Sequence, residues 1–229
     1  MSEAQPEPEG GDLDALIRRT DPDRWLSSRF IGDTAARADV VVLYAYDGEL
    51  ARAPRVASNP LLGEIRLTWW REVLDQVFVA GPVRAHPVAQ ALAVVVRRHG
   101  LAREPLEAMI DARYRELDPT PMTDTEALDW ARDTGGLTAQ LAAQILDASA
   151  DGKMALAGGS AWALGHRLVG QPELRPVFMN VIHAARSASR SLSVAAFPAV
   201  AHAVFAGRPS TNDFARRLRL TMAIARGKI

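Results

Sequence analysis

The sequence LLGEIRLTWWREVLDQVF, residues 61–78, spaces its apolar side chains at the interval of an α-helix. One stripe is formed by Leu62, Ile65, Trp69 and Val73, with Leu61, Trp70, Leu74 and Val77 beside it. Charged residues occupy most of the positions between these two groups. A half-buried strand would instead alternate apolar and polar residues in pairs. The segment therefore predicts an amphipathic helix that places this stripe against a core.

Most of the remaining sequence is also typical of helices separated by short loops. We expect helices over residues 12–20, 24–52, 88–99, 103–118, 123–146, 153–169, 172–192, 195–205 and 212–226. Residues 39–46, DVVVLYAY, have the β-branched content of a strand, but their flanks lack turn residues, so we interpret them as buried helix. Because no internal repeat occurs and no linker follows residue 11, the chain predicts one all-α domain over residues 12–229.

Composition excludes several classes of protein. The 229 residues include 27 Lys and Arg, 27 Asp and Glu, and no Cys. This balance argues against a nucleic-acid partner, and the lack of cysteine excludes disulfides and thiolate metal sites. Residues 1–11 are acidic and rich in Pro and Gly, which predicts a disordered leader rather than a signal peptide. The charge-free run 191–207 is too short for a span of ~20 residues. We therefore expect a cytoplasmic protein.

Residues 43–75 resemble the squalene/phytoene synthases, which are head-to-head trans-prenyltransferases. Residues 44–46, Tyr-Ala-Tyr, are similar to an aromatic triplet of that family, and the Trp-rich segment 66–75 is its most specific match. The resemblance covers about residues 25–229 and weakens after residue 165. It implies a single-domain isoprenoid-synthase-like helical bundle. The stretch GELAR…GEIRLTWWR is most similar to a branch related to respiratory complex I assembly factors.

The chain departs from that family where the family binds metal. There, two aspartate-rich helix segments hold Mg²⁺ ions that bind the diphosphate of an allylic substrate. Aligned on residues 44–46, the first cluster falls at Ala51, Arg52 and Arg55. The second is expected near residues 160–185, where no aspartate occurs. Because arginine repels a divalent cation, we expect no catalytic residue, no metal ligand and no cofactor.

The favoured hypothesis is a non-catalytic relative that keeps an apolar cavity and binds an isoprenoid or lipid, or serves as an assembly factor with a protein partner. The candidate ligand-binding residues are Tyr44, Tyr46, Arg52, Arg55, Arg66, Trp69, Trp70, Arg71, Gly135 and Gly136. Guanidinium groups match phosphate oxygens, and aromatic rings would line the cavity. Each group has a structural alternative: surface ion pairs for the arginines, core packing for the aromatic residues, and a helix crossing for the glycines.

Two other hypotheses remain open. The first is an active prenyltransferase that uses unusual Mg²⁺ ligands, namely Asp47, Glu49, Asp129 and Asp133. The second is a helical scaffold whose cavity has collapsed. In addition, the basic amphipathic segment 214–229 predicts either peripheral contact with the inner membrane or packing on its own domain.

Overall fold

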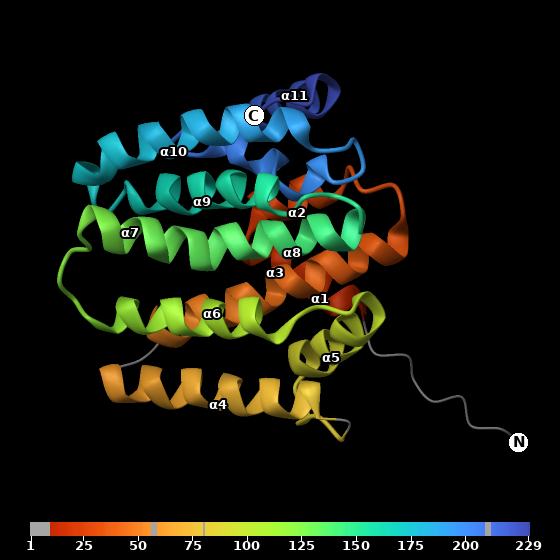
Figure 1. Cartoon of the computed structure of the whole chain (residues 1–229), viewed down its shortest axis with the longest axis vertical. Helices are drawn as coiled ribbons and strands as arrows, with labels where there is room; N and C mark the ends of the chain where they lie inside the picture. Colours follow the sequence, from red (N-terminus) through yellow and green to blue (C-terminus); the bar gives the residue numbers. More distant parts are fainter. Residues whose placement is uncertain (1–9, 56–58, 80, 209–211) are drawn as a thin grey trace, which may run out of the picture.

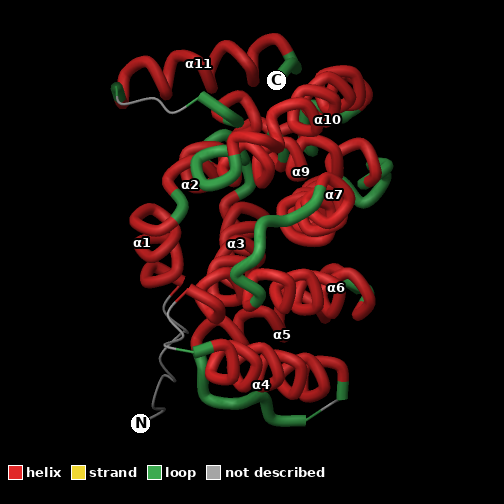
Figure 2. The backbone as a smooth tube through the Cα atoms, turned by 90° about the vertical axis from the view of Figure 1, so that its left-hand side faces the viewer, coloured by secondary structure: helices red, strands yellow, loops and turns green. Residues whose placement is uncertain are grey.

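The computed structural model describes residues 10–55, 59–79, 81–208 and 212–229, and within these residues every regular element is a helix (Figure 2). The α-helices are α1 (Gly10–Thr20), α2 (Pro22–Ser28), α3 (Thr34–Arg55), α4 (Pro60–Phe78), α5 (Pro87–His99), α6 (Arg103–Tyr114), α7 (Asp124–Ala131), α8 (Leu137–Leu146), α9 (Lys153–Arg167), α10 (Arg175–Ala188) and α11 (Asp213–Arg226). A π-helix, η2 (Arg132–Gly136), joins α7 to α8. The predicted all-α class is confirmed.

The helices stack in layers. From one end of the molecule to the other, the order is α4, then α6, then α7–η2–α8, then α9, then α10, and α11 lies beside α10 at the far end (Figures 1 and 2). Helix α3 runs through the middle and packs against α1, α4, α5, α6 and α8. Its segment 39–46 is buried on all sides, which explains the unbroken apolar run and confirms the helical interpretation.

The helix predicted over residues 24–52 is in fact two helices. Helix α2 ends at Ser28, and the chain turns before α3 begins at Thr34. The turn is stabilised by Asp33, whose Oδ1 accepts hydrogen bonds from the backbone N–H groups of Ala35 at 2.8 Å and Ala36 at 3.2 Å. An aspartate in this position caps a helix N-terminus, and it starts α3 in a new direction.

The apolar stripe predicted on residues 61–78 is correct only in its second half. The buried residues of α4 are Gly63, Leu67, Trp70, Val73, Leu74 and Val77. By contrast, Leu61 and Ile65 are 61% and 55% exposed. Helix α4 lies at the edge of the stack and packs on α3, α5 and α6, so only one side of it reaches the core.

The later elements are close to expectation. The helix predicted over residues 123–146 is continuous but widens into the π-helix η2 at its centre. The segment 195–205 forms two short 3₁₀ helices, η5 (Phe197–Ala199) and η6 (Ala201–Phe205). Three more 3₁₀ turns are η1 (Arg115–Leu117), η3 (Pro172–Leu174) and η4 (Ser189–Ser191). Of the predicted leader, residues 1–9 lie outside the described residues, and Gly10 and Gly11 begin α1.

Candidate functional site

Four of the predicted ligand-binding residues gather at a pocket between α3 and α4. The pocket has a volume of about 430 Å³ and is lined by Arg52, Arg66, Trp69, Trp70, Glu49, His86, Ala53 and Ile65. Arg52 forms a long ion pair of 3.8 Å with Glu49, and Arg66 forms none with the described residues. The volume falls in the usual range for small-molecule sites, and both guanidinium groups are exposed.

One wall of this pocket is aromatic. Trp70 is buried and Trp69 is half-buried, and their ring centroids lie 5.0 Å apart in an edge-to-face arrangement. His86, at the start of α5, packs edge-on against both indoles, at 5.5 Å from Trp69 and 5.4 Å from Trp70. On the far side, Tyr46 packs against Trp70 at 5.4 Å. The two tryptophans therefore both support the core and line the pocket.

The other six candidates lie elsewhere. Tyr44 and Tyr46 are fully buried, and the Tyr46 hydroxyl donates a 2.9 Å hydrogen bond to the Leu106 carbonyl. Arg55 ends α3 and is exposed outside the lining of the α3–α4 pocket. Arg71 points to the opposite side of α4, where it pairs with Asp111 of α6. These residues are close to the pocket residues in sequence, but their side chains do not point into the pocket.

The two glycines serve a helix crossing. A Cβ atom on Gly135 would lie 2.5 Å from the Gly159 carbonyl oxygen of α9, and one on Gly136 would lie 2.6 Å from Ser160 Oγ. Such distances are below any van der Waals contact. Gly135 and Gly136 thus allow η2 and α9 to touch backbone to backbone, which is the structural alternative expected for them.

The interior holds a charged network that the sequence reasoning missed. Asp47 of α3 accepts a 2.6 Å hydrogen bond from Arg24 Nη1 of α2 and a 2.5 Å bond from Arg113 Nη2 of α6. Arg113 Nη1 in turn donates to Glu116 at 2.5 Å, and the Trp130 indole donates to the same carboxylate at 2.8 Å. Arg24, Asp47 and Arg113 are at most 4% exposed. The two charge-assisted hydrogen bonds fix the position of the buried carboxylate between the two arginines.

This pairing decides the protonation state of Asp47. Burial alone raises the pKa of its carboxyl group, but attraction to Arg113 and Arg24 outweighs burial, so the pKa falls to about 2. The carboxylate is ionised at neutral pH, with each oxygen held by a different guanidinium. Asp47 therefore has no free oxygen to offer a metal ion.

The other ligands of the prenyltransferase hypothesis are also paired with arginine. Glu49 faces Arg52. Asp129 and Asp133 both face Arg132, at 3.4 Å and 2.7 Å. In the described part of the chain, no three His, Asp or Glu side chains gather closely enough to hold a metal ion. These residues do not fit the Mg²⁺ ions that the resemblance would imply, so no reaction step is assigned to them.

A second interior cluster surrounds Tyr44. Its ring packs edge-on to His202 at 6.3 Å, and Trp162 packs against the same imidazole at 5.4 Å. The Arg24 guanidinium carbon lies 4.0 Å from the centre of the Trp162 ring, a close cation–π contact. Burial, followed by repulsion from Arg24, lowers the pKa of His202 to about 3, so the imidazole is neutral. Aromatic rings and a neutral imidazole therefore fill the interior beside Tyr44.

A sequence signal for this network did exist. Arg113 falls on the buried stripe of α6 with Leu106, Met109 and Ile110, at the spacing of one helical face. Asp47 occupies an equivalent place on α3. Charged residues are almost never fully buried unless they are paired, so a charge on an apolar face indicates a buried partner. The partner itself cannot be identified without the fold.

The helical stack and the tryptophan-rich α4 are those of an isoprenoid-synthase-like protein. A sequence model described as squalene/phytoene synthase matches residues 17–168, about two thirds of the chain. The chain belongs to the squalene/phytoene synthase family. A crystal structure of a dehydrosqualene synthase in complex with ligand superposes with a TM-score of 0.70, covering 95% of both chains at 14% sequence identity. This likeness confirms the predicted fold.

Curated relatives narrow the resemblance further. The chain is 29% identical over 132 residues to "NADH dehydrogenase (ubiquinone) complex I, assembly factor 6" of Bos taurus, and 27% identical over 132 residues to the Homo sapiens protein. Each alignment covers 57% of this chain and 39% of the relative, so the chain spans less than half the length of these relatives. The predicted similarity to complex I assembly factors is confirmed.

Proposed function

We propose that this chain is a non-catalytic member of its family with an assembly-type role. The observation that carries the proposal is the charge at the end of α3. Arg52 and Arg55 are exposed there, and the buried Asp47 carboxylate is hydrogen-bonded to two arginines. Ionising an allylic diphosphate requires divalent cations to stabilise the leaving group. A surface that carries arginine in their place binds anions but does not assemble a metal cluster.

Similarity to assembly factor 6 supports the second half of the proposal. Those relatives are named for the assembly of NADH dehydrogenase complex I, and the alignment with them covers 57% of this chain. We infer that the chain contacts a protein partner during the assembly of a respiratory NADH dehydrogenase. In this role the fold supplies a rigid shape and surface.

The α3–α4 pocket is the proposed ligand site. Its exposed arginines suit a phosphate or diphosphate group, and Trp69, Trp70 and Ile65 suit an apolar chain. The proposed ligand is an isoprenoid or another lipid with an anionic head, bound without metal and without turnover.

Calorimetry with farnesyl diphosphate tests this site. We expect binding of the same affinity with Mg²⁺ and with EDTA, and no release of pyrophosphate. The double variant Arg52→Gln, Arg66→Gln should bind more weakly. The variant Arg19→Gln, Arg97→Gln is the matched control, because both arginines are exposed and lie outside the pocket lining. Turnover that requires Mg²⁺ would refute the non-catalytic assignment.

A deletion strain tests the assembly role. Loss of the chain in its own host should lower the amount of mature NADH dehydrogenase on native gels and leave prenyl lipid levels unchanged. Rescue by the Arg52→Gln, Arg66→Gln variant would separate the assembly role from ligand binding. A normal enzyme complex in the deletion strain contradicts the proposal.

A further inference from the structure

Charge is strongly segregated along this chain, although its formal net charge is zero. Residues 175–229 contain nine Lys and Arg but only one acidic residue, Asp213, whereas residues 1–174 contain 18 basic and 26 acidic residues. In the structure, the basic region forms α10, α11 and the 3₁₀ segment between them, at the end of the stack opposite α4 (Figures 1 and 2). One end of the molecule is thus strongly cationic.

Helices α10 and α11 enclose an open groove of about 570 Å³ at this end. Six cationic side chains line it, namely Arg175, Arg186, Arg208, Arg219, Arg226 and Lys228, and no acidic side chain does. None of the six is among the ion pairs that the described residues form with one another. Between them, Phe178, Met179 and Ile182 of α10 supply apolar surface.

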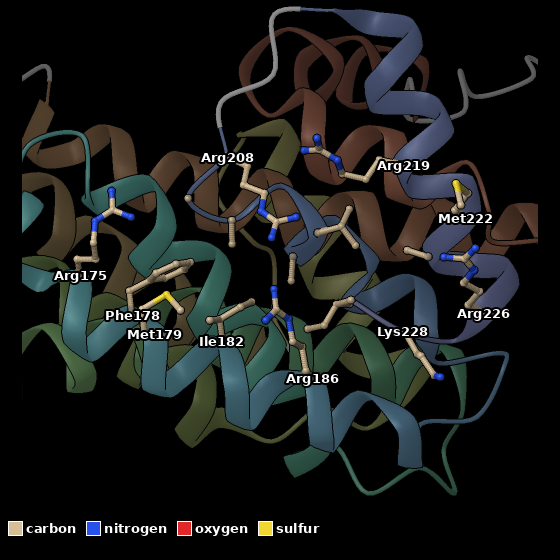
Figure 3. Close-up of a pocket in the computed structure, with 16 residues that line it drawn as sticks. Arg175, Phe178, Met179, Ile182, Arg186, Arg208, Arg219, Met222, Arg226 and Lys228 are labelled. Atoms are coloured by element: carbon tan, nitrogen blue, oxygen red, sulfur yellow. The ribbon is translucent and has the colours of Figure 1, made fainter.

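Two of the cations face each other across the groove. In Figure 3, Arg186 of α10 and Arg208 of the segment after η6 direct their guanidinium groups toward one another from opposite walls. Arg219 approaches from α11, and its Nη1 is buried without a hydrogen-bond partner among the described residues. Like charges that face each other are unfavourable, and an anion between them removes that cost. Guanidinium groups in this arrangement match a phosphate.

The outer side of α11 carries an apolar stripe beside the groove. Phe214, Leu218 and Met222 recur every four residues and are 72%, 49% and 41% exposed. At about 100° per residue, this stripe adjoins the groove-lining face of α11, and Met222 belongs to both. Large exposed apolar side chains next to cations are typical of helices that lie in a membrane interface.

We propose that the α10–α11 end of this protein docks onto an anionic bilayer surface. The groove receives the phosphate headgroup of an anionic phospholipid, with Arg186 and Arg208 on either side of it. Phe214, Leu218 and Met222 enter the boundary between headgroups and acyl chains. The cations of the groove complement the negative charge of the headgroup. The apolar stripe beside them favours a lipid surface over an acidic peptide or a free phosphate. This surface is separate from the α3–α4 pocket.

Vesicle co-sedimentation of the full chain tests the proposal. We compare vesicles of phosphatidylcholine alone with vesicles of equal parts phosphatidylcholine and phosphatidylglycerol. The wild type should sediment with the anionic vesicles only, and added salt should release it because screening weakens the attraction. The Arg186→Gln, Arg208→Gln variant should partition about 30-fold more weakly, since each cation near an anionic bilayer contributes roughly a fivefold gain.

Two further variants keep the result interpretable. Arg19→Gln, Arg97→Gln removes the same charge from exposed sites outside the groove and should bind like the wild type. Phe214→Ser, Leu218→Ser should bind anionic vesicles more weakly while keeping its salt dependence. Equal binding to both kinds of vesicle would overturn the proposal. So would equal losses in the groove and control variants, or calorimetric binding of inorganic phosphate without binding to vesicles.

Discussion

The buried Asp47 offers the sharpest test of the proposed non-catalytic role. The substitution Asp47→Asn keeps the shape of the side chain but leaves Arg24 and Arg113 buried without their shared carboxylate. Breaking a buried ion pair by removing one partner costs about 3–5 kcal/mol of folding free energy. The lowered pKa gives an independent figure: a fall from 3.8 to about 2 corresponds to about 2–3 kcal/mol at neutral pH. We expect the melting temperature to fall by about 6–10 °C.

Thermal unfolding followed by circular dichroism measures this loss. Asp133→Asn is the matched control, because its ion pair with Arg132 is far less buried, with the two side chains 23% and 52% exposed, and should contribute at most ~1 kcal/mol. The pH dependence has a definite sign. Since the folded pKa of Asp47 lies below the unfolded value, its contribution is complete above about pH 4 and is lost as the pH falls toward 2. The gap between wild type and variant should therefore close over that interval.

Two results would refute this reasoning. If Asp47→Asn is as stable as the wild type, the network is not a source of stability. If Mg²⁺ raises the melting temperature of the wild type but not of Asp47→Asn, the carboxylate is a metal ligand rather than an arginine partner, and the non-catalytic assignment falls with it.

Three further substitutions follow from the packing and burial of single residues. Gly135→Ala places a Cβ atom 2.5 Å from the Gly159 carbonyl oxygen and should destabilise the fold by about 2 kcal/mol or more. By contrast, the Cβ atom of Gly48→Ala meets no atom within 4 Å, and this variant should stabilise α3 by about 0.5–1 kcal/mol. Urea unfolding of both variants measures this contrast. His202 has a folded pKa of about 3, below its unfolded value of 6.5, so its contribution is lost as the pH falls between these values. His202→Gln should flatten urea midpoints measured from pH 7 to pH 4.5, and an unchanged slope would show that another group titrates there.

Local sequence was enough to predict most helices because their signals lie within a few residues. Helix α9, for example, was expected over residues 153–169 and is found over Lys153–Arg167. The π-helix at Arg132–Gly136 was not foreseen, since the close approach of α9 to Gly135 and Gly136 is a tertiary contact. The same limit explains the error on α4, where Leu62 and Ile65 are apolar but face outward.

The candidate site divides in the same way. The two tryptophans and the arginines at 52 and 66 were identifiable from a resemblance carried by neighbouring positions, and they meet at the α3–α4 pocket. Arg71 was chosen for the same reason but binds Asp111 on the far side of its helix. The position of a residue in the sequence fixes where it lies along the helix axis. Which face of the helix packs against other helices depends on the tertiary structure.

By itself, the sequence determined that the chain is helical and that Ala51, Arg52 and Arg55 follow its aromatic triplet, because both properties depend only on the order of the residues. Tertiary structure alone decided which charges meet. Arg24, Asp47 and Arg113 are separated by 23 and 66 residues, and they pair only because α2 and α6 both pack against α3. The energy of an ion pair depends on the distance between the charges in space and not on their separation along the chain. A buried network of this kind therefore exists only once the helices have packed.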